Sequence, residues 1–144
     1  MPDLKEVRTS LEVGFTAGSL PERFIRYRGR ATRSLEVKGE FPYEDAQFQV
    51  VMIDALSLTQ ESVREVHRVL RPEGWLFFEI AEGKYLKNSG KSLSDIFALL
   101  KDGFNIVEVE RASWWSRWRG NGVTVISAQK KRWRTVVSFA GRGA

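Results

Sequence analysis

Two nearly continuous apolar runs, FQVVMID at 48–54 and WLFFEI at 75–80, most constrain the fold of this chain. Central strands of a parallel sheet are covered on both faces and consist of such runs. The segment between them begins at Thr59, an N-cap residue type, has apolar positions at helical spacing, and ends at Pro72. The sequence therefore predicts a strand, a helix and a second strand in this order.

The rest of the chain continues this alternation of strand and helix signals. The further elements that we expect are strands at 10–14, 33–38, 105–111 and 122–129, and helices at 20–28 and 92–101. Alternating strands and helices followed by a closing β pair predict an open, largely parallel α/β sheet of about six or seven strands with about three helices.

Composition limits the chemistry that this domain can support. The chain of 144 residues contains no cysteine, which excludes disulfides and cysteine-ligated zinc, and its single histidine, His67, cannot build a multi-histidine metal site. We therefore expect no metal centre. No apolar run approaches the roughly 20 residues of a membrane span, and the first residues lack the apolar stretch of a signal peptide, so we expect a cytoplasmic location.

Charge is distributed unevenly along the chain. Residues 1–110 hold 15 Lys and Arg against 18 Asp and Glu, whereas residues 111–144 hold 8 Lys and Arg and no acid. The same end carries four of the five tryptophans. We expect one domain over 1–130 and a basic C-terminal tail over 131–144, with a further strand in that tail as one interpretation.

Two stretches carry a resemblance to a known family. FPYEDAQFQVV at 41–51 and SVREVHRVLRPEGWLFFEI at 62–80 resemble the class I S-adenosylmethionine-dependent methyltransferases, and are closest to their type 11 group. Upstream, LEVGFTAGSL at 11–20 resembles the glycine-rich first motif of that family. The resemblance covers about half of the chain and implies a Rossmann-like open sheet with S-adenosylmethionine as cofactor.

The resemblance also implies which residues face the cofactor. In the family, the cofactor lies over the glycine turn after the first strand, and an acidic residue that ends the second strand binds the ribose hydroxyls. Glu12 would orient the methionine end of the cofactor, and the turn would comprise Gly14, Thr16 and Gly18. Glu36 would bind the ribose, and Glu40 or Asp45 would face the adenine.

The sequence departs from the family at two points. Thr16 stands where the family has its middle glycine, so a β-branched side chain occupies space that the family leaves open. From Glu36 the chain reaches Phe41 almost at once, which leaves no room for the usual helix and third strand. We expect a shortened sheet in which the strand at 33–38 lies beside the strand at 10–14, and that one beside the strand at 48–54.

Other candidate residues have a structural interpretation beside the functional one. Asp54, at the end of the central strand, is either a general base or a helix-entry residue, and the absence of a D-P-P-Y signature favours the latter. His67 lies on an apolar helix face and is expected to be packed rather than catalytic. Glu79 and the loop residues Lys84 and Tyr85 are the remaining candidates near a substrate.

The basic, tryptophan-rich end has two interpretations. Arginine neutralises phosphates and tryptophan stacks on unpaired bases, so the end could bind RNA; alternatively, it packs on the sheet edge, on a second copy or on a protein partner. The missing edge exposes apolar surface that something must cover, which favours packing. The residues concerned are Trp114, Trp115, Arg117, Trp118, Arg119, Lys130, Lys131, Arg132, Trp133 and Arg134.

Two hypotheses for function remain at this point. The first is a methyltransferase that transfers a methyl group from S-adenosylmethionine to a small molecule or RNA. The second is a non-catalytic relative that keeps the fold as a binding or assembly module with a degenerate cofactor site. The altered glycine turn and the lost segment favour the second, whereas Glu12 and Glu36 favour the first.

The basic end generates a prediction that separates its two interpretations. Binding of a short single-stranded RNA, titrated at low and moderate salt, should weaken strongly as salt rises, because the cationic side chains displace counterions from phosphates. Replacing Trp115→Ala and Arg119→Ala together should weaken it further. If no binding appears at low salt, the tryptophans belong to packing or self-association, and size-exclusion chromatography with light scattering then separates monomer from dimer.

Overall fold

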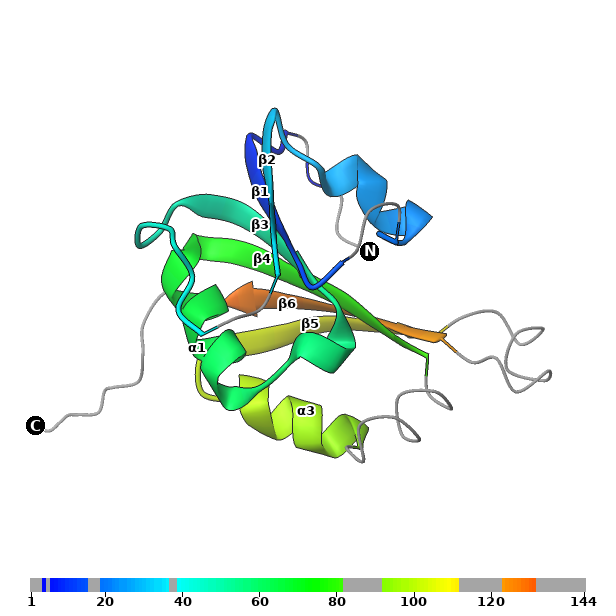
Figure 1. Cartoon of the computed structure of the whole chain (residues 1–144). Coiled ribbons are helices and arrows are strands. Elements are labelled where there is room, and N and C mark those ends of the chain that lie inside the picture. Colours follow the sequence, from blue (N-terminus) through cyan, green and yellow to red (C-terminus); the bar gives the residue numbers. More distant parts are fainter. Residues whose placement is uncertain are drawn as a thin grey trace, which may run out of the picture.

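The computed structural model describes residues 4, 6–15, 19–36, 39–81, 92–111 and 123–131. These residues form one six-stranded sheet with the order β2-β1-β3-β4-β6-β5 (Figure 1). The first four strands in this order pair in parallel, and β6 pairs antiparallel with both of its neighbours. The strands are β1 (Thr9–Val13), β2 (Ala31–Leu35), β3 (Phe48–Ile53), β4 (Leu70–Ala81), β5 (Phe104–Arg111) and β6 (Val123–Lys130). The predicted α/β class with a mostly parallel sheet is confirmed.

The shortened sheet is confirmed as well. β2 lies directly beside β1, with Glu12 opposite Ser34, and β3 pairs with the other side of β1, where Glu12 lies opposite Met52. Within the described ranges, no strand adjoins the outer side of β2. The chain therefore passes from β2 to β3 without the helix and strand that the family places between them.

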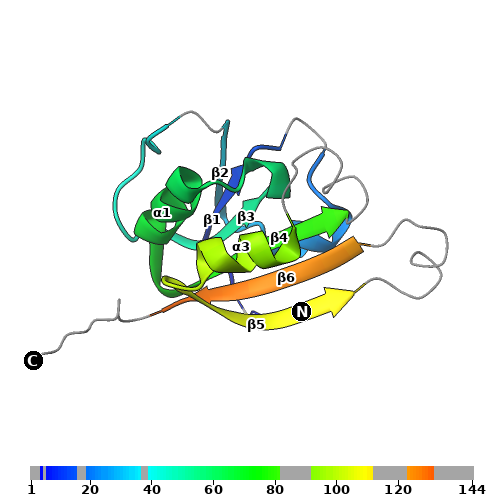
Figure 2. The ribbon, with the colours of Figure 1, turned by 90° about the horizontal axis from the view of Figure 1, so that it is seen from below.

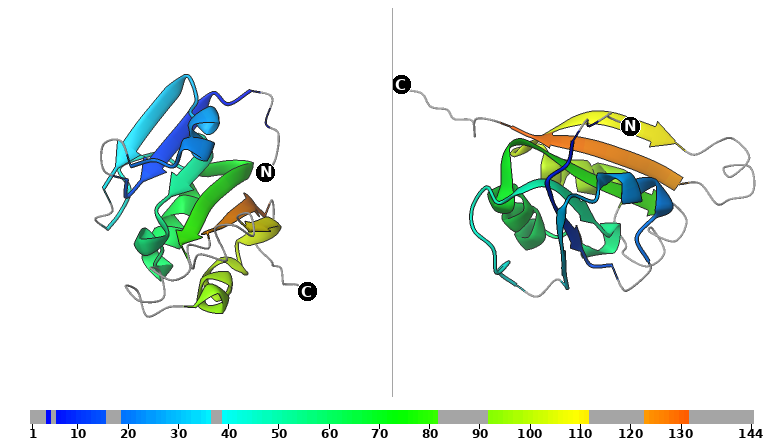
Figure 3. Two further views of the ribbon diagram at one scale, coloured as in Figure 1. Left: turned by 90° about the vertical axis from the view of Figure 1, so that its right-hand side faces the viewer. Right: turned by 90° about the horizontal axis from the view of Figure 1, so that it is seen from above.

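Helices cover the two faces of the sheet unequally (Figure 2, Figure 3). The helices α1 (Gln60–Val69) and α3 (Leu93–Leu100) pack on one face, where their buried side chains join those of β3 and β4 in the larger hydrophobic cluster. The opposite face carries the short 3-10 helix η1 (Glu22–Tyr27) among the described residues. Both α-helices begin where predicted, because Thr59 and Ser92 form capping boxes.

The predicted helix at 20–28 is only partly correct, since the structure forms the 3-10 helix η1 there. Its two buried residues, Phe24 and Tyr27, are three positions apart, which is the repeat of a 3-10 helix. The Tyr27 ring stacks on Phe77 of β4 at 4.3 Å. Pro21 at the N-cap makes no side-chain capping bond, and Arg28 already has extended backbone. The tertiary contact of two aromatic rings thus sets the conformation of this segment.

The boundary between α1 and β4 also differs from the prediction. We expected the helix to run to Pro72, but α1 ends at Val69 and β4 begins at Leu70. The pairing of β3 with β4 shifts register after Phe48, and Glu73 takes a φ of 64° to accommodate the irregularity. The proline thus lies inside the irregular start of a strand.

Arg68 holds the direct connection between β2 and β3. Its guanidinium donates to the carbonyl oxygens of Phe41 and Tyr43 at 2.9 and 2.8 Å. It also pairs with both carboxylate oxygens of Glu65, at 3.1 and 2.9 Å, and with Asp45 at 2.9 Å. One side chain of α1 therefore fixes the turn that replaces the missing helix and strand.

Removing this side chain should destabilise the fold. We expect Arg68→Ala to lower the free energy of unfolding by about 2–3 kcal/mol in urea titrations, because two carbonyl groups and two carboxylates lose charged hydrogen bonds. Arg64→Ala, an exposed change on the same helix, serves as the control and should cost less than about 0.5 kcal/mol. Equal costs for the two variants would contradict the role given to Arg68.

The effect of Arg68→Ala should depend on pH with a defined sign. The hydrogen bond from Arg68 holds the pKa of Glu65 below its ordinary value. This stabilisation is therefore present above the pKa of Glu65 in the unfolded chain and is lost as pH falls through the pKa in the folded state. The difference in free energy of unfolding between the wild type and Arg68→Ala should therefore become smaller as the pH falls through the pKa of Glu65 in the folded state.

Candidate functional site

The carboxyl ends of the parallel strands bring together the acidic residues singled out from the sequence. Asp54 follows β3, and its backbone N–H donates to the carbonyl oxygen of Val13, the last residue of β1, at 2.9 Å. Glu79 lies near the end of the neighbouring strand β4. Ligands of open α/β sheets bind at this edge, so we treat it as the candidate site.

Gly14 begins the turn after β1 and has a φ of 81°, a conformation that other residues rarely adopt. Its N–H donates to the carbonyl oxygen of Leu35 at 2.8 Å. A Cβ at this position would collide with the hydroxyl oxygen of Ser57 and lie 3.3 Å from the Cβ of Asp54. Ser57 belongs to the short 3-10 helix η2 (Ala55–Ser57), which Asp54 caps. The chain's own η2 therefore requires a glycine here.

The carboxylate of Glu12 is buried on the η1 face and already has a partner. Arg28 donates to its two oxygens at 2.7 and 3.2 Å. The side chain of Glu12 is 7% exposed, and its hydrogen bond raises the pKa of Arg28. Both carboxylate oxygens of the residue predicted to orient a methionine group are thus engaged by a guanidinium of the same chain.

Glu79 and Asp54 form the second acidic feature of this edge. Arg23 of η1 pairs with Glu79 at 2.9 Å between Nη1 and Oε2. Burial raises the pKa of Glu79; the charge of Arg23 opposes this rise and the charge of Asp54 adds to it. Among the described residues, the carboxylate of Asp54 accepts one long bond of 3.4 Å, from the N–H of Leu56, as the cap of η2. Asp54 thus caps η2, and burial favours the neutral form of Glu79.

Of the remaining predicted cofactor residues, Glu36 also lies at this edge, because it follows Leu35, whose carbonyl oxygen accepts the hydrogen bond from Gly14. Glu36 lies immediately after β2 and Glu40 lies in the next turn, and both are exposed. Thr16 and Gly18 lie outside the described residues, as do Lys84 and Tyr85. The described residues contain no group of three or more acidic or histidine side chains arranged to hold a metal ion.

Two of the ten predicted surface residues of the basic end are described, and both form hydrogen bonds within the fold. The ammonium group of Lys130 donates to the carbonyl oxygen of Leu70 at 2.7 Å, and that of Lys131 donates to the carbonyl oxygen of Lys101 at 2.8 Å. The other eight predicted surface residues lie outside the described residues; they are Trp114, Trp115, Arg117, Trp118, Arg119, Arg132, Trp133 and Arg134.

Sequence reasoning missed three residues that shape the site: Arg23, Arg28 and Ser57. A signal for Arg28 was present, because an acid in the middle of a buried strand, such as Glu12, needs a cationic partner. The segment 20–28 contains three arginines that could have been this partner. The structure shows that it is Arg28. Nothing in the sequence indicated that Ser57 approaches Gly14.

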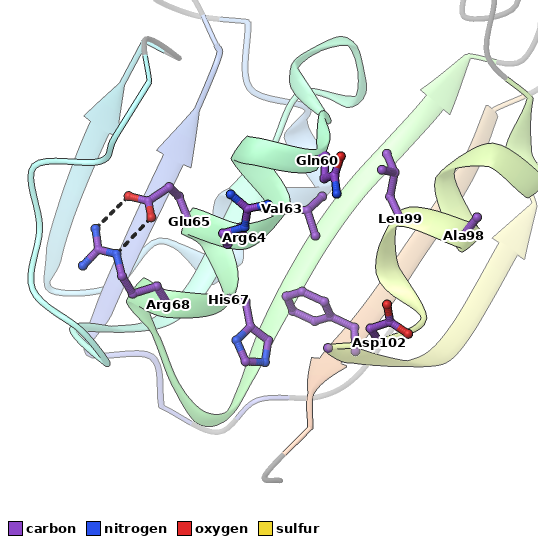
Figure 4. Close-up of a pocket in the computed structure, with 11 residues that line it drawn as sticks. Gln60, Val63, Arg64, Glu65, His67, Arg68, Ala98, Leu99 and Asp102 are labelled. Carbon is purple, nitrogen blue, oxygen red and sulfur yellow. Dashed lines mark hydrogen bonds and ion pairs between the residues drawn. The ribbon is translucent and has the colours of Figure 1, made fainter. Parts of the chain in front are cut away.

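A groove of about 500 Å³ lies between α1 and α3, on the helical face of the sheet (Figure 4). His67 lines it, and its ring stands edge-on to Phe104 with 5.5 Å between ring centroids. Gly103 approaches this ring closely, since a Cβ there would lie 2.7 Å from Cδ2 of His67. His67 is therefore packed, as expected, and its ring lines one end of the groove.

No family model matches the chain. No curated protein matches it either. No helix among the described residues combines the length and apolar character needed to cross a membrane.

Solved structures do resemble it. The N-methyltransferase NodS of Bradyrhizobium japonicum WM9 has a TM-score of 0.64 and 13% identity, with 88% of this chain and 87% of that chain covered. The 1,6-didemethyltoxoflavin-N1-methyltransferase of Burkholderia thailandensis, solved with S-adenosylhomocysteine, has a TM-score of 0.62 and 15% identity. The match covers 88% of this chain and 72% of that chain. A complex between the Trm112 methyltransferase activator of Haloferax volcanii and a provisionally assigned methyltransferase gives a TM-score of 0.64 and 12% identity, covering 89% and 84%. At these identities, the chain shares the fold of S-adenosylmethionine-dependent methyltransferases.

The electrostatics of the carboxyl edge can be measured directly. In a carbon-13 NMR titration, the pKa of Glu79 should lie above its ordinary value, because burial disfavours the charged form. Arg23→Ala should raise it further, and Asp54→Asn should lower it. Arg26→Ala is the matched control, since Arg26 donates instead to the hydroxyl of Tyr27 at 2.8 Å. A shift of the same size in the Arg26→Ala variant would contradict the assignment.

Proposed function

We propose that this chain is a methyltransferase-like domain with a degenerate S-adenosylmethionine site, and that it works as a binding or assembly module. The observation that carries the proposal is the contact of η2 with Gly14. In a cofactor-binding turn, the missing side chain leaves space for the ligand. Here the hydroxyl of Ser57 occupies the space that a side chain at Gly14 would take.

Two further observations support a degenerate site. Glu12 is engaged by Arg28 through both oxygens, so a cofactor ammonium group would have to compete with a charged, bidentate partner. β2 is exposed from Ala31 to Ser34, and no strand adjoins its outer side among the described residues, so part of an adenine wall is absent there. An open adenine gains little from burial.

The second candidate function is an active S-adenosylmethionine-dependent methyltransferase acting on a small molecule or RNA. The raised pKa of Glu79 beside Asp54 favours it, because a carboxylate of this kind can accept a proton at the edge where such sheets bind ligands. In that case Glu36 would bind the ribose, Glu40 or Asp45 would face the adenine, and Gly14, Thr16 and Gly18 would form the turn.

The proposal extends to family group, location and partners. We place the chain closest to the type 11 group, because of the motif RVLRPEG at 68–74, and in the cytoplasm. A binding role requires a partner, and we propose a protein partner or a second copy at the tryptophan-rich end. The Haloferax complex, in which a similar fold is found with an activator protein, supports a protein partner. RNA is the alternative.

Isothermal titration calorimetry with S-adenosylmethionine and its demethylated product tests the proposal. The wild type should bind more weakly than about 10 μM. Thr16→Gly should strengthen whatever binding exists, because overpacking by a β-branched side chain costs about 1–3 kcal/mol, or roughly 5- to 150-fold in affinity. Glu36→Ala should abolish this binding. Glu44→Ala, which changes another exposed glutamate, is the matched control and should leave it unchanged.

The opposite result is equally clear. Micromolar or tighter binding by the wild type would refute the degenerate site and make the methyltransferase the better hypothesis. Arg28→Ala then distinguishes the two roles of Glu12: a gain in affinity indicates that the ion pair competes with the cofactor, and a loss indicates that it helps to form the site.

A further inference from the structure

The groove between α1 and α3 has no place in the proposed function. Its lining is mixed: Val63 on α1, Leu99 on α3 and Phe104 give an apolar part, and polar and charged side chains make up the rest. Figure 4 shows one end of the groove, where His67 and Asp102 lie close to the point at which α3 leads into β5. A volume of about 500 Å³ is large enough for a tryptophan side chain, which buries about 150–250 Å² when covered.

The described chain ends beside this groove. The backbone N–H of Lys131 donates to the carbonyl oxygen of Gly103 at 2.9 Å, and its ammonium group donates to the carbonyl oxygen of Lys101 at 2.8 Å. Gly103 itself lines the groove, and Lys101 caps the C-terminus of α3. Two hydrogen bonds to one turn therefore hold Lys131, the last described residue, beside the groove.

Trp133 is within reach of the groove. It follows Lys131 by two residues, which span at most about 7 Å. The loop that carries the other tryptophans of the basic end follows Arg111, at the far end of β5. Because an eight-residue strand is about 26 Å long, that loop starts at the opposite edge of the sheet.

The groove also carries charges of both signs, and of its two arginines, Arg64 and Arg68, the second is already paired with Glu65 and Asp45. Asp102 lies at the rim of the groove, is exposed, and forms no ion pair within the described ranges. Arg132 and Arg134 flank Trp133 in the sequence, so an indole inside the groove brings a guanidinium to the rim on either side. Glu65, the other acid of the groove, is already bound by Arg68.

We infer that Trp133 of the chain's own C-terminal segment docks into the α1–α3 groove, with Arg132 or Arg134 paired to Asp102. The inference is independent of whether a cofactor binds at the carboxyl edge. It removes Trp133 from the surface offered to RNA or to a partner, and leaves the loop tryptophans for that role.

Fluorescence quenching in the full chain tests this docking. Since the chain has no cysteine, Arg64→Cys introduces a single thiol at the exposed side of the groove, which takes a bimane label that tryptophan quenches on contact. Replacing Trp133→Phe in the labelled protein should raise its emission several-fold, because phenylalanine fits the groove without quenching. Trp118→Phe should leave the emission unchanged, and so should Trp133→Phe in a chain labelled at Thr32→Cys on β2.

Three outcomes would overturn the inference. Equal emission from the Trp133 and Trp133→Phe proteins would show that the groove does not hold this side chain. Quenching of the labelled Trp133→Phe protein by added unlabelled wild type would assign the groove to the tail of a second copy. Asp102→Lys should reduce the quenching, and Glu44→Lys is the matched control. Unchanged quenching after Asp102→Lys would show that no arginine of the segment pairs with Asp102.

Discussion

The guanidinium of Arg68 is the interaction on which the shape of this domain depends. A parallel sheet normally passes from one strand to the next through a helix that covers its face. Between β2 and β3 this chain has only a turn, whose carbonyl groups at Phe41 and Tyr43 are bound by Arg68. Because Arg68 lies on α1, the turn is tied to a helix that packs on the sheet core. The helix that follows β3 thus also supports the segment that precedes it.

The carboxyl edge of the sheet is largely satisfied by the chain itself. Glu12 pairs with Arg28, Glu79 pairs with Arg23, and Gly14 accommodates Ser57. Two of these three contacts come from Arg23 of η1 and from Arg28, the residue that follows η1 on the less covered face. This short segment therefore neutralises both acids. On the face that the helices cover less, Glu12 and Glu79 are therefore neutralised by arginines of the same chain.

The sequence predicted the elements whose signals are local and strong. The apolar run of β3, the capping residues Thr59 and Ser92, and the short distance from Glu36 to Phe41 gave the sheet and its missing edge. Features that depend on tertiary contacts were not predictable. The aromatic stack of Tyr27 on Phe77 converts an expected helix into a 3-10 turn, and a register shift moves the start of β4 ahead of its proline. The partners of Glu12 and Gly14 were missed for the same reason.

The exposed strand β2 also bears on whether other chains can add to this shortened sheet. A bare edge with unpaired N–H and C=O groups is a template onto which other chains can add strands and polymerise. β2 is only five residues long and carries the charged Arg33 in its centre, and Arg30 directly precedes it. Short length and like-charge repulsion between approaching copies are common protections against such growth. A sheet that ends at β2 is therefore poorly suited to seeding fibrils.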